Sequence, residues 1–397
     1  MKTALIIAEF NPYHNGHKYI AEKARELTGA DYVVALMSGN FVQRGGPAIV
    51  DRFTRARMAL NSGIDLVIAY PTRYATCSAE EYAGHAMQIA HELGCFDVVF
   101  FGSECGDIDK LTECAKILAE EPFEYQTLLR RYLKQGCSFP QARARALPQY
   151  KELLSTPNNI LGIEYIKAIL RGKYDLTPMT CARVGTDHAS KDFSGEYASA
   201  TAIREKLSAS DISEISSCMP ATSYKLLVDA HQKNTLLLED DLSFLLTSAL
   251  WEAGSARELA KYLSVTDTFA NAAWSLKTTC LSFSEFAMML KNRSLTYTHV
   301  SRALLHIALR IEKDADVSDV AHILGMRKEA GPLISRMTET SQIPVIKRPA
   351  RELAGLSYAQ KYLFDEELRI SNLYNILVGM KSGQEIQNDM SRRLITL

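Results

Sequence analysis

Short apolar runs alternate with segments of helical hydrophobic spacing in the N-terminal part of the chain. Buried strands are predicted at residues 4–8, 31–37, 65–71, 97–101 and 179–184, and helices from about residue 16, at 52–62 and at 78–93. Solid apolar strands that alternate with helices are typical of a parallel sheet covered by helices on both faces. We therefore predict an α/β fold whose ligand-binding loops follow the carboxyl ends of the strands.

The pattern becomes mainly helical in two further regions. Residues 111–169 form one of them, with a break at 136–140, and a polar loop at 185–195 precedes a helix that opens at 199–204. After about residue 236, helical spacing recurs at 242–251, 256–263, 269–275, 283–291, 299–311, 359–373 and 377–380, with a short extended segment at 343–346. We predict a domain at residues 1–225 with a helical insertion at about 110–170, followed by a mainly α-helical domain at 236–397.

Composition narrows the class of protein. The 397 residues carry a formal net charge of −1, so a nucleic-acid surface would have to be a local patch. Eight cysteines are scattered without a CxxC pair, which argues against a structural zinc site or a disulfide framework and fits a reducing cytoplasm. The chain lacks the leader pattern of a secreted protein and any apolar run of about 20 residues, so we expect a cytoplasmic protein without a membrane span.

Two histidines stand where the first strand turns into the first helix. The segment Pro12-x-His14-x-Gly16-His17 places both at a helix N-terminus, which suits phosphate because its backbone N–H groups are unpaired. Imidazole donors there can stabilise phosphate oxygens whose charge grows in a transition state. The alternative is that one histidine caps the helix and the other packs.

Three polar segments are candidate partners of this turn. Ser199, Thr201 and Arg204 open a later helix and can serve as phosphate ligands or as ordinary caps. The loop at residues 39–48 contains several glycines together with Asn40, Gln43 and Arg44, whose side chains suit contacts with a ligand. The alternative interpretation is a long surface connection without a ligand. Asn158 and Asn159 can each be the N-cap of a helix or present an amide to a nucleotide.

Two basic stretches are candidates for contact with nucleic acid. One consists of Arg130, Arg131, Lys134, Arg143 and Arg145, for which a solvated helix face is an equally good interpretation. The other is in the C-terminal region, where Arg293, Thr296, Tyr297 and Arg302 adjoin an amphipathic helix. Basic and hydroxyl groups beside an aromatic ring suit a phosphate backbone and an unstacked base, and a solvated face is again the alternative.

The motifs together resemble one family. The HxGH turn is the signature of HIGH-type nucleotidyltransferases, which attack the α-phosphate of ATP and release pyrophosphate. The segments EFNPYHNGH, GNFVQRGGPAIVDRFTRARMAL, DLVIAYPTRYATCSAEEYA, FGSECGD, PNNILGIEY, SATAIR and RSLTYTHVSRALLHIAL resemble the tRNA(Met) cytidine acetate ligase family. This resemblance implies a Rossmann-like fold and a reaction that joins acetate to ATP. The acetyl group of the resulting acetyl-adenylate then passes to N4 of the wobble cytidine in elongator tRNA(Met), giving N4-acetylcytidine.

The resemblance also implies a set of site residues. ATP contacts are expected at Ile7, Ala8, Glu9, Phe10, Asn11, Pro12, Tyr13, His14, Asn15, Gly16, His17, Lys18, Tyr19, Ile20, Gly102, Asn158 and Arg183. We expect His14 and His17 to stabilise the α-phosphate, and Arg183 and Arg204 to hold phosphates. Mg²⁺ is expected from the ATP chemistry and not from a ligand cluster, and no protein partner is indicated. The remaining alternatives are a nucleotidyltransferase with a small-molecule acceptor and a non-catalytic RNA-binding protein.

Overall fold

The computed structural model describes residues 1–184, 196–208, 212–280 and 282–397, so the polar loop expected at 185–195 lies outside it. Within this part, five parallel strands stand in the order β5-β2-β1-β6-β7. They are β1 (Thr3–Ala8), β2 (Tyr32–Ser38), β5 (Leu66–Tyr70), β6 (Val98–Ser103) and β7 (Thr177–Ala182). The five strands predicted from the apolar runs are thereby confirmed. The strand order reverses between β1 and β6, and a crevice opens at such a point in doubly wound sheets.

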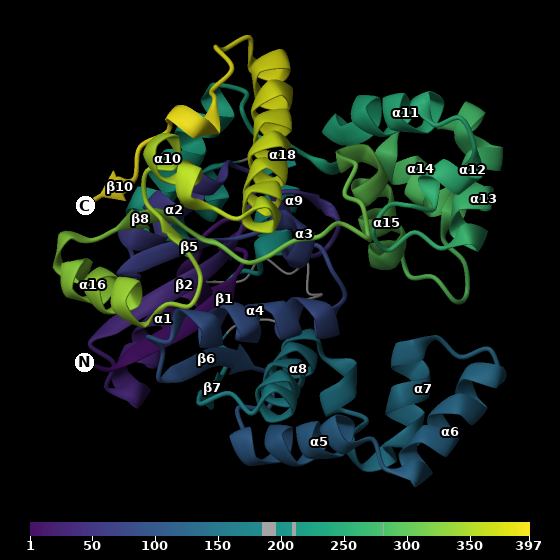
Figure 1. Cartoon of the computed structure of the whole chain (residues 1–397), viewed down its shortest axis with the longest axis horizontal. Coiled ribbons are helices and arrows are strands. Elements are labelled where there is room, and N and C mark those ends of the chain that lie inside the picture. The colour runs from purple at the N-terminus through teal and green to yellow at the C-terminus, as the bar shows by residue number, and fades with distance from the viewer. Residues whose placement is uncertain (185–195, 209–211, 281) are drawn as a thin grey trace.

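Helices cover both faces of this sheet, as predicted (Figure 1). Alternation within β1 divides the core, because Leu5 packs into one layer while Ala4 and Ile6 pack into the other. The first layer is covered by α4 (Ala79–Leu93), α5 (Ile108–Glu120), α8 (Pro157–Gly172) and α16 (Gly331–Thr340). The second is covered by α1 (Asn15–Thr28), α2 (Arg52–Leu60), α9 (Ala200–Ser208) and α10 (Ala221–Gln232).

A separate helical unit follows the sheet domain along the chain. It has its own core and comprises α11 (Ser243–Glu252), α12 (Ala256–Leu259), α13 (Asp267–Leu276), α14 (Phe283–Leu290) and α15 (Tyr297–Leu309). The long helix α18 (Tyr358–Ser382) lies between this unit and the sheet, and Ile370, Tyr374 and Leu377 join the core of the unit (Figure 1). Helix α17 (Pro349–Glu352) precedes it.

The last part of the chain returns to the sheet, which the sequence analysis did not anticipate. Strand β8 (Ala321–Met326) pairs antiparallel with β5, and β9 (Val345–Ile346) and β10 (Ile395–Thr396) pair with β8. The expected helical region 236–397 thus contains three strands of the main sheet. Strand β8 is a single short apolar run among helices, so its hydrophobic spacing alone does not separate it from a helix turn. The domain boundary at 225–236 stays a prediction.

The predicted helical insertion projects from the sheet domain as α6 (Phe123–Lys134) and α7 (Phe139–Ala146) (Figure 1). Its break is where the sequence placed it, because α6 ends before Gly136 and α7 begins with a Pro at its second residue. Arg143 is corrected from a candidate RNA contact to a core residue, because its buried side chain pairs with Glu164 of α8.

Two buried arginines of α2 fix the loops at the carboxyl edge of the sheet. Arg55 is fully buried and donates to the backbone oxygens of Val50, Glu9 and Ser38 at 3.0, 2.6 and 3.0 Å, and to that of Gly39. Burial lowers the pKa of Arg55 to about 10, so the guanidinium stays charged at neutral pH.

Its neighbour Arg52 ties the C-terminal helix to the same edge. Arg52 pairs with Glu367 at 2.9 Å and with Asp389 at 3.0 Å, and all three side chains are buried. A buried ion pair of this kind is costly to break, because the remaining charge has no water around it.

We predict that Arg55→Leu lowers the free energy of unfolding by about 3–5 kcal/mol, because each buried acceptor left without a donor costs about 1–3 kcal/mol. The substitution leaves carbonyls at the ends of β1 and β2 without donors. Urea denaturation measures the change, and Arg57→Leu is the control because Arg57 is exposed on the same helix. Equal urea midpoints for the two variants would contradict the proposed contribution of Arg55 to the stability of the fold.

Candidate active site

A cavity of about 210 Å³ lies at the carboxyl ends of β1 and β6, where the strand order reverses. It is lined by Ile6, Ile7, Ala8, Glu9, Phe10, Asn11, His14, His17, Ile20, Gln43, Arg44, Tyr82, Phe101, Gly102, Pro157, Asn158, Leu161, Tyr165, Arg183, Ala200, Thr201 and Arg204. The strand-to-helix turn, the glycine loop and the opening of α9 therefore meet at one place, although they are far apart in the sequence.

The two histidines form a close, tilted pair at the start of α1. Their ring centroids are 3.8 Å apart with an angle of 31° between the planes. His14 is the N-cap of α1, and its Nδ1 accepts the N–H of Gly16 at 3.1 Å. The Nδ1 of His17 accepts the N–H of His14 at 3.3 Å. His14 thus caps the helix and lines the cavity, so the two interpretations of the sequence do not exclude each other.

These hydrogen bonds determine the chemical character of both rings. A neutral imidazole whose Nδ1 accepts a hydrogen bond carries its proton on Nε2, and Nε2 is then a donor. The positive end of the α1 dipole adds to the attraction for an anion. The site therefore suits a phosphate group better than a metal ion, which would need an imidazole nitrogen as an acceptor.

Two arginines supply full positive charge to the cavity. Arg204 of α9 donates to the backbone oxygen of Asn11 at 2.6 Å and to Thr201 Oγ1 at 3.3 Å. Arg183, just after β7, donates to Asn158 Oδ1 at 3.2 Å. Burial lowers the pKa of both arginines, and the charge of Arg44 lowers that of Arg204 further. Arg44, Arg183 and Arg204 all line the cavity, and their positive charge favours an anionic ligand.

Gly102 at the end of β6 allows a close approach of side chains. A Cβ atom at this position would lie 2.6 Å from Ile20 Cδ1 and 3.0 Å from Arg183 Cγ. Any larger residue would displace Arg183, which explains why a glycine stands there. Asn158 is positioned by Glu104, whose Oε1 accepts from the Asn158 N–H and Nδ2 at 3.1 and 2.7 Å.

Several predicted site residues have structural roles and do not line this cavity. Asn40 is 1% exposed and is corrected from a ligand-reading residue to a brace, since its amide bonds Ser371 Oγ and the N–H of Arg52. Asn159 bonds Cys105 N–H and Thr156 Oγ1, and Ser199 accepts from Ala202 N–H. The N-cap of α8 is Thr156, so the expectation that Asn158 or Asn159 caps this helix is wrong.

Within the opening turn, the residues that point elsewhere also have identifiable partners. Tyr13 is buried and donates to Ser62 O, and Asn15 donates to the backbone of Glu196 and Ser217. Lys18 pairs with Glu22 and Tyr19 packs on Tyr197. Pro12 and Gly16 shape the turn without lining the cavity. From residues 7–20, the lining side is Ile7, Ala8, Glu9, Phe10, Asn11, His14, His17 and Ile20.

Sequence reasoning missed the aromatic side of the cavity. Tyr82 of α4, Phe101 of β6 and Tyr165 of α8 line it, and each is buried in the core of the first layer. Their spacing in the sequence is that of ordinary core residues. No local motif shows which core side chains also face a ligand. All three lie in segments that resemble the ligase family, and this resemblance is the signal that could have found them.

The glycine loop is the hairpin β3 (Phe41–Val42) and β4 (Gly46–Pro47), which connects the cavity to the helical unit. The N–H of Gln43 donates to Glu9 Oε1 at 3.0 Å. Gly45 has φ of +88°, and a Cβ there would lie 2.5 Å from the backbone nitrogen of Arg302 in α15. Arg302 is mostly buried and donates to Gln43 O at 3.5 Å, so it joins α15 to the hairpin.

The other residues predicted to touch tRNA lie around the start of α15. Arg293 is exposed, whereas Thr296 is the N-cap that accepts from His299 N–H at 3.3 Å. Tyr297 is half-buried and faces a neighbouring cavity. Arg293 and Thr296 are thus both open to solvent, and Thr296 and Arg302 also have roles within the fold.

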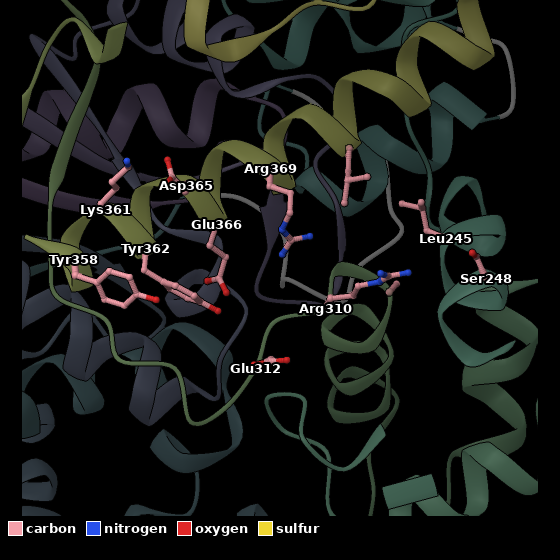
Figure 2. Close-up of a pocket in the computed structure, with 12 residues that line it drawn as sticks. Leu245, Ser248, Arg310, Glu312, Tyr358, Lys361, Tyr362, Asp365, Glu366 and Arg369 are labelled. Atoms are coloured by element: carbon pink, nitrogen blue, oxygen red, sulfur yellow. The ribbon is translucent and has the colours of Figure 1, made fainter. Parts of the chain in front are cut away.

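A larger cavity of about 860 Å³ lies between α11, α15 and α18 (Figure 2). Its walls carry both signs of charge, with Asp365, Glu366 and Arg369 on α18 and Arg310 and Glu312 just after α15. Figure 2 shows Tyr358, Tyr362 and Glu366 along α18 and Arg310 on the facing helix. None of the residues singled out for phosphate chemistry lines it, so the smaller cavity is the candidate active site.

Two searches of the described residues bear on metals and membranes. In that part of the chain, no group of three or more His, Cys, Asp or Glu side chains is placed to hold a metal ion. No helix found there combines the length and the apolar character needed to cross a membrane.

Comparisons with known proteins agree with this geometry. The tRNA(Met) cytidine acetate ligase of Acetivibrio thermocellus is 33% identical, covering 98% of this chain and 99% of that protein. The ligase of the same name from Clostridium novyi is 35% identical over 88% of this chain and 90% of that protein. The crystal structure of Thermotoga maritima TmcAL bound with alpha-thio ATP has a TM-score of 0.88 at 28% identity, with both chains covered completely. The apo form of the same protein gives 0.90 at 29% identity.

The family model described as HIGH Nucleotidyl Transferase matches residues 1–389, which includes the histidine turn, the hairpin, the helical unit and strands β8 and β9. The match extends over the sheet and the helical unit alike, so the two parts are common to the family. The chain therefore belongs to the HIGH nucleotidyl transferase family, and its curated relatives within it are tRNA(Met) cytidine acetate ligases.

Proposed function

We propose that this protein is an ATP-dependent ligase that joins acetate to N4 of the wobble cytidine of elongator tRNA(Met), through an acetyl-adenylate. The observation that carries the proposal is the closely packed His14–His17 pair at the start of α1, in a cavity that is also lined by Arg183 and Arg204. Relatives that match almost the whole chain bear the name of this activity, and the similar Thermotoga structure binds an ATP analogue. A cytoplasmic location is part of the same proposal.

In the first step, a carboxylate oxygen of acetate attacks the α-phosphorus of ATP. The bond from that phosphorus to the oxygen bridging to the β-phosphate breaks, and pyrophosphate leaves with the electron pair. The Nε2–H groups of His14 and His17 stabilise charge on the phosphate oxygens, while Arg183 and Arg204 hold the phosphates. Arg44 is exposed at the cavity and can pair with the acetate, and Gln43 lies beside it.

In the second step, the N4 amine of cytidine attacks the acetyl carbon. The bond between that carbon and the phosphate oxygen breaks, AMP leaves with the electron pair, and the amine releases one proton. Cytosine N4 is a weak nucleophile, so an activated acyl group held in line with it is needed. The residues around the start of α15 are proposed to contact tRNA, with Arg293 on the phosphate backbone and Tyr297 beside a base.

A magnesium ion on the triphosphate is part of the proposal. Mg²⁺ usually keeps several waters and is held by substrate phosphates with one or two carboxylates, so a three-residue cluster is not required. Glu9 is the carboxylate that lines the cavity among the described residues and can hold the ion. When bound, the ion neutralises phosphate charge during the displacement.

We predict that His17→Ala lowers the rate of acetate-dependent pyrophosphate release by 10²–10³-fold, the usual cost of removing one preorganised donor at a developing negative charge. His91→Ala is the matched control, because His91 is exposed near the end of α4 and away from the cavity. The assay uses ATP and labelled acetate, with and without tRNA. Undiminished turnover of the His17 variant would remove the histidine pair from the mechanism.

We predict that Arg293→Gln weakens tRNA binding and reduces the slope of log affinity against log salt by about one, because one phosphate contact is lost. Lys328→Gln is the control, since it removes the same charge from an exposed site in another part of the chain. Binding is measured by filter retention from about 50 to 200 mM salt. An unchanged slope in the Arg293 variant would show that this residue does not neutralise a phosphate.

A further inference from the structure

A second cavity of about 330 Å³ adjoins the candidate active site. Four residues, Asn11, Arg44, Thr201 and Arg204, line both cavities. The two cavities therefore share a wall that includes Arg44 and Arg204, which we have placed at the acetate and the phosphates. A group bound in the second cavity lies next to the proposed reaction centre.

The remaining wall of the second cavity combines apolar side chains with one aromatic ring. It is formed by the hairpin, the segment before α11 and the start of α15, and consists of Val42, Gly46, Pro47, Leu237, Leu238, Glu239, Tyr297 and Thr298, with Glu205 from α9. Such a wall suits a planar ring, because bases in single-stranded RNA stack on aromatic side chains and pack on aliphatic ones.

Glu239 gives this wall a fixed hydrogen-bond acceptor. Ser301 Oγ donates to Glu239 Oε1 at 3.0 Å, and Tyr297 lines the same cavity as this carboxylate. A carboxylate accepts about four hydrogen bonds through its two oxygens, so the contact with Ser301 orients the group and leaves capacity for a ligand. The side chains of Tyr297 and Glu239 are both half-buried, so a ligand can reach them.

We propose that the cytosine base of the acceptor nucleotide occupies this second cavity, with its face on Tyr297 and one N4 hydrogen donated to the Glu239 carboxylate. This inference rests on the proposed function and names the site of its second substrate. A carboxylate accepts from cytosine N4, whereas uracil presents an acceptor oxygen at the same position and is disfavoured there. Glu239 is in this sense a positioning and specificity residue.

The start of α15 supports the placement of a nucleotide and not of a free base. Helix α15 has 13 residues and begins at Tyr297, so its positive end lies beside the cavity, and Thr298 in its first turn lines the wall. A phosphate that flanks the acceptor nucleotide is attracted to such an end. The exposed Arg293 lies a few residues before it in the chain.

The test compares Glu239→Gln and Tyr297→Leu with Glu339→Gln and Tyr358→Leu, two exposed controls outside both cavities. Acetate-dependent exchange of pyrophosphate into ATP, measured without tRNA, reports the first step alone. Acetyl transfer to tRNA(Met) gives kcat and KM, and a tRNA(Met) transcript with uridine at the wobble position serves as a competitor. Exchange at the wild-type rate also shows that a variant is folded.

We expect both site variants to keep exchange within twofold of the wild type and to lose acetyl transfer by at least tenfold. In Glu239→Gln the amide can donate to a uracil oxygen, so discrimination against the uridine competitor should fall by about 10-fold or more. Wild-type transfer and discrimination in both site variants would overturn the proposal, and so would a loss of exchange in Glu239→Gln. A wild-type protein that performs no exchange would overturn the proposed function instead, so the two failures are distinguishable.

Discussion

The guanidinium of Arg55 is the interaction on which the geometry of the site depends. It lies inside the protein and donates to backbone oxygens at the ends of β1 and β2 and at the start of α2. Those oxygens belong to the residues that turn away from the sheet toward the cavity, so their hydrogen bonds cannot come from strand pairing. One side chain with several donors in a rigid plane satisfies them together. Arg55 thereby fixes the loops at the carboxyl edge of the sheet, next to the cavity.

The same edge carries the attachment of the helical unit. Arg52 reaches Glu367 and Asp389, Asn40 bonds Ser371 of α18, and the Tyr374 hydroxyl donates to Ala48 O at 2.8 Å. On the other side of the hairpin, Gly45 lies against the backbone of α15. Residues 38–50 are therefore fixed both to the phosphate cavity and to the helices proposed to bind tRNA. Because the contacts are buried, the two parts cannot shift independently without exposing polar groups.

How far the sequence predicted this structure depended on the range of the interactions. The five parallel strands and the HxGH turn were found because apolar runs, glycine and histidine spacing are local signals. Strand β8 was missed because its partner, β5, lies more than 250 residues earlier, and pairing at that distance leaves no local pattern. Asn40 was misassigned for a related reason, since an amide in a glycine-rich loop looks like a ligand contact until Ser371 and Arg52 are seen beside it. Tyr82 and Tyr165 have the spacing of ordinary core residues.

The charge of the shared wall restricts which acceptors can react. Arg44 and Arg204 line both cavities, and positive charge that favours a triphosphate disfavours any cation brought to the same wall. An alkylamine such as a lysine side chain is protonated at neutral pH and would be repelled by these two arginines, whereas Glu205 and Glu239 on the remaining wall would attract it. The exocyclic amine of cytosine is uncharged and can approach. Arg204, proposed to bind ATP, and Arg44, proposed to bind acetate, thus favour an uncharged amine at the shared wall, and a nearly neutral chain needs only this local concentration of charge to do so.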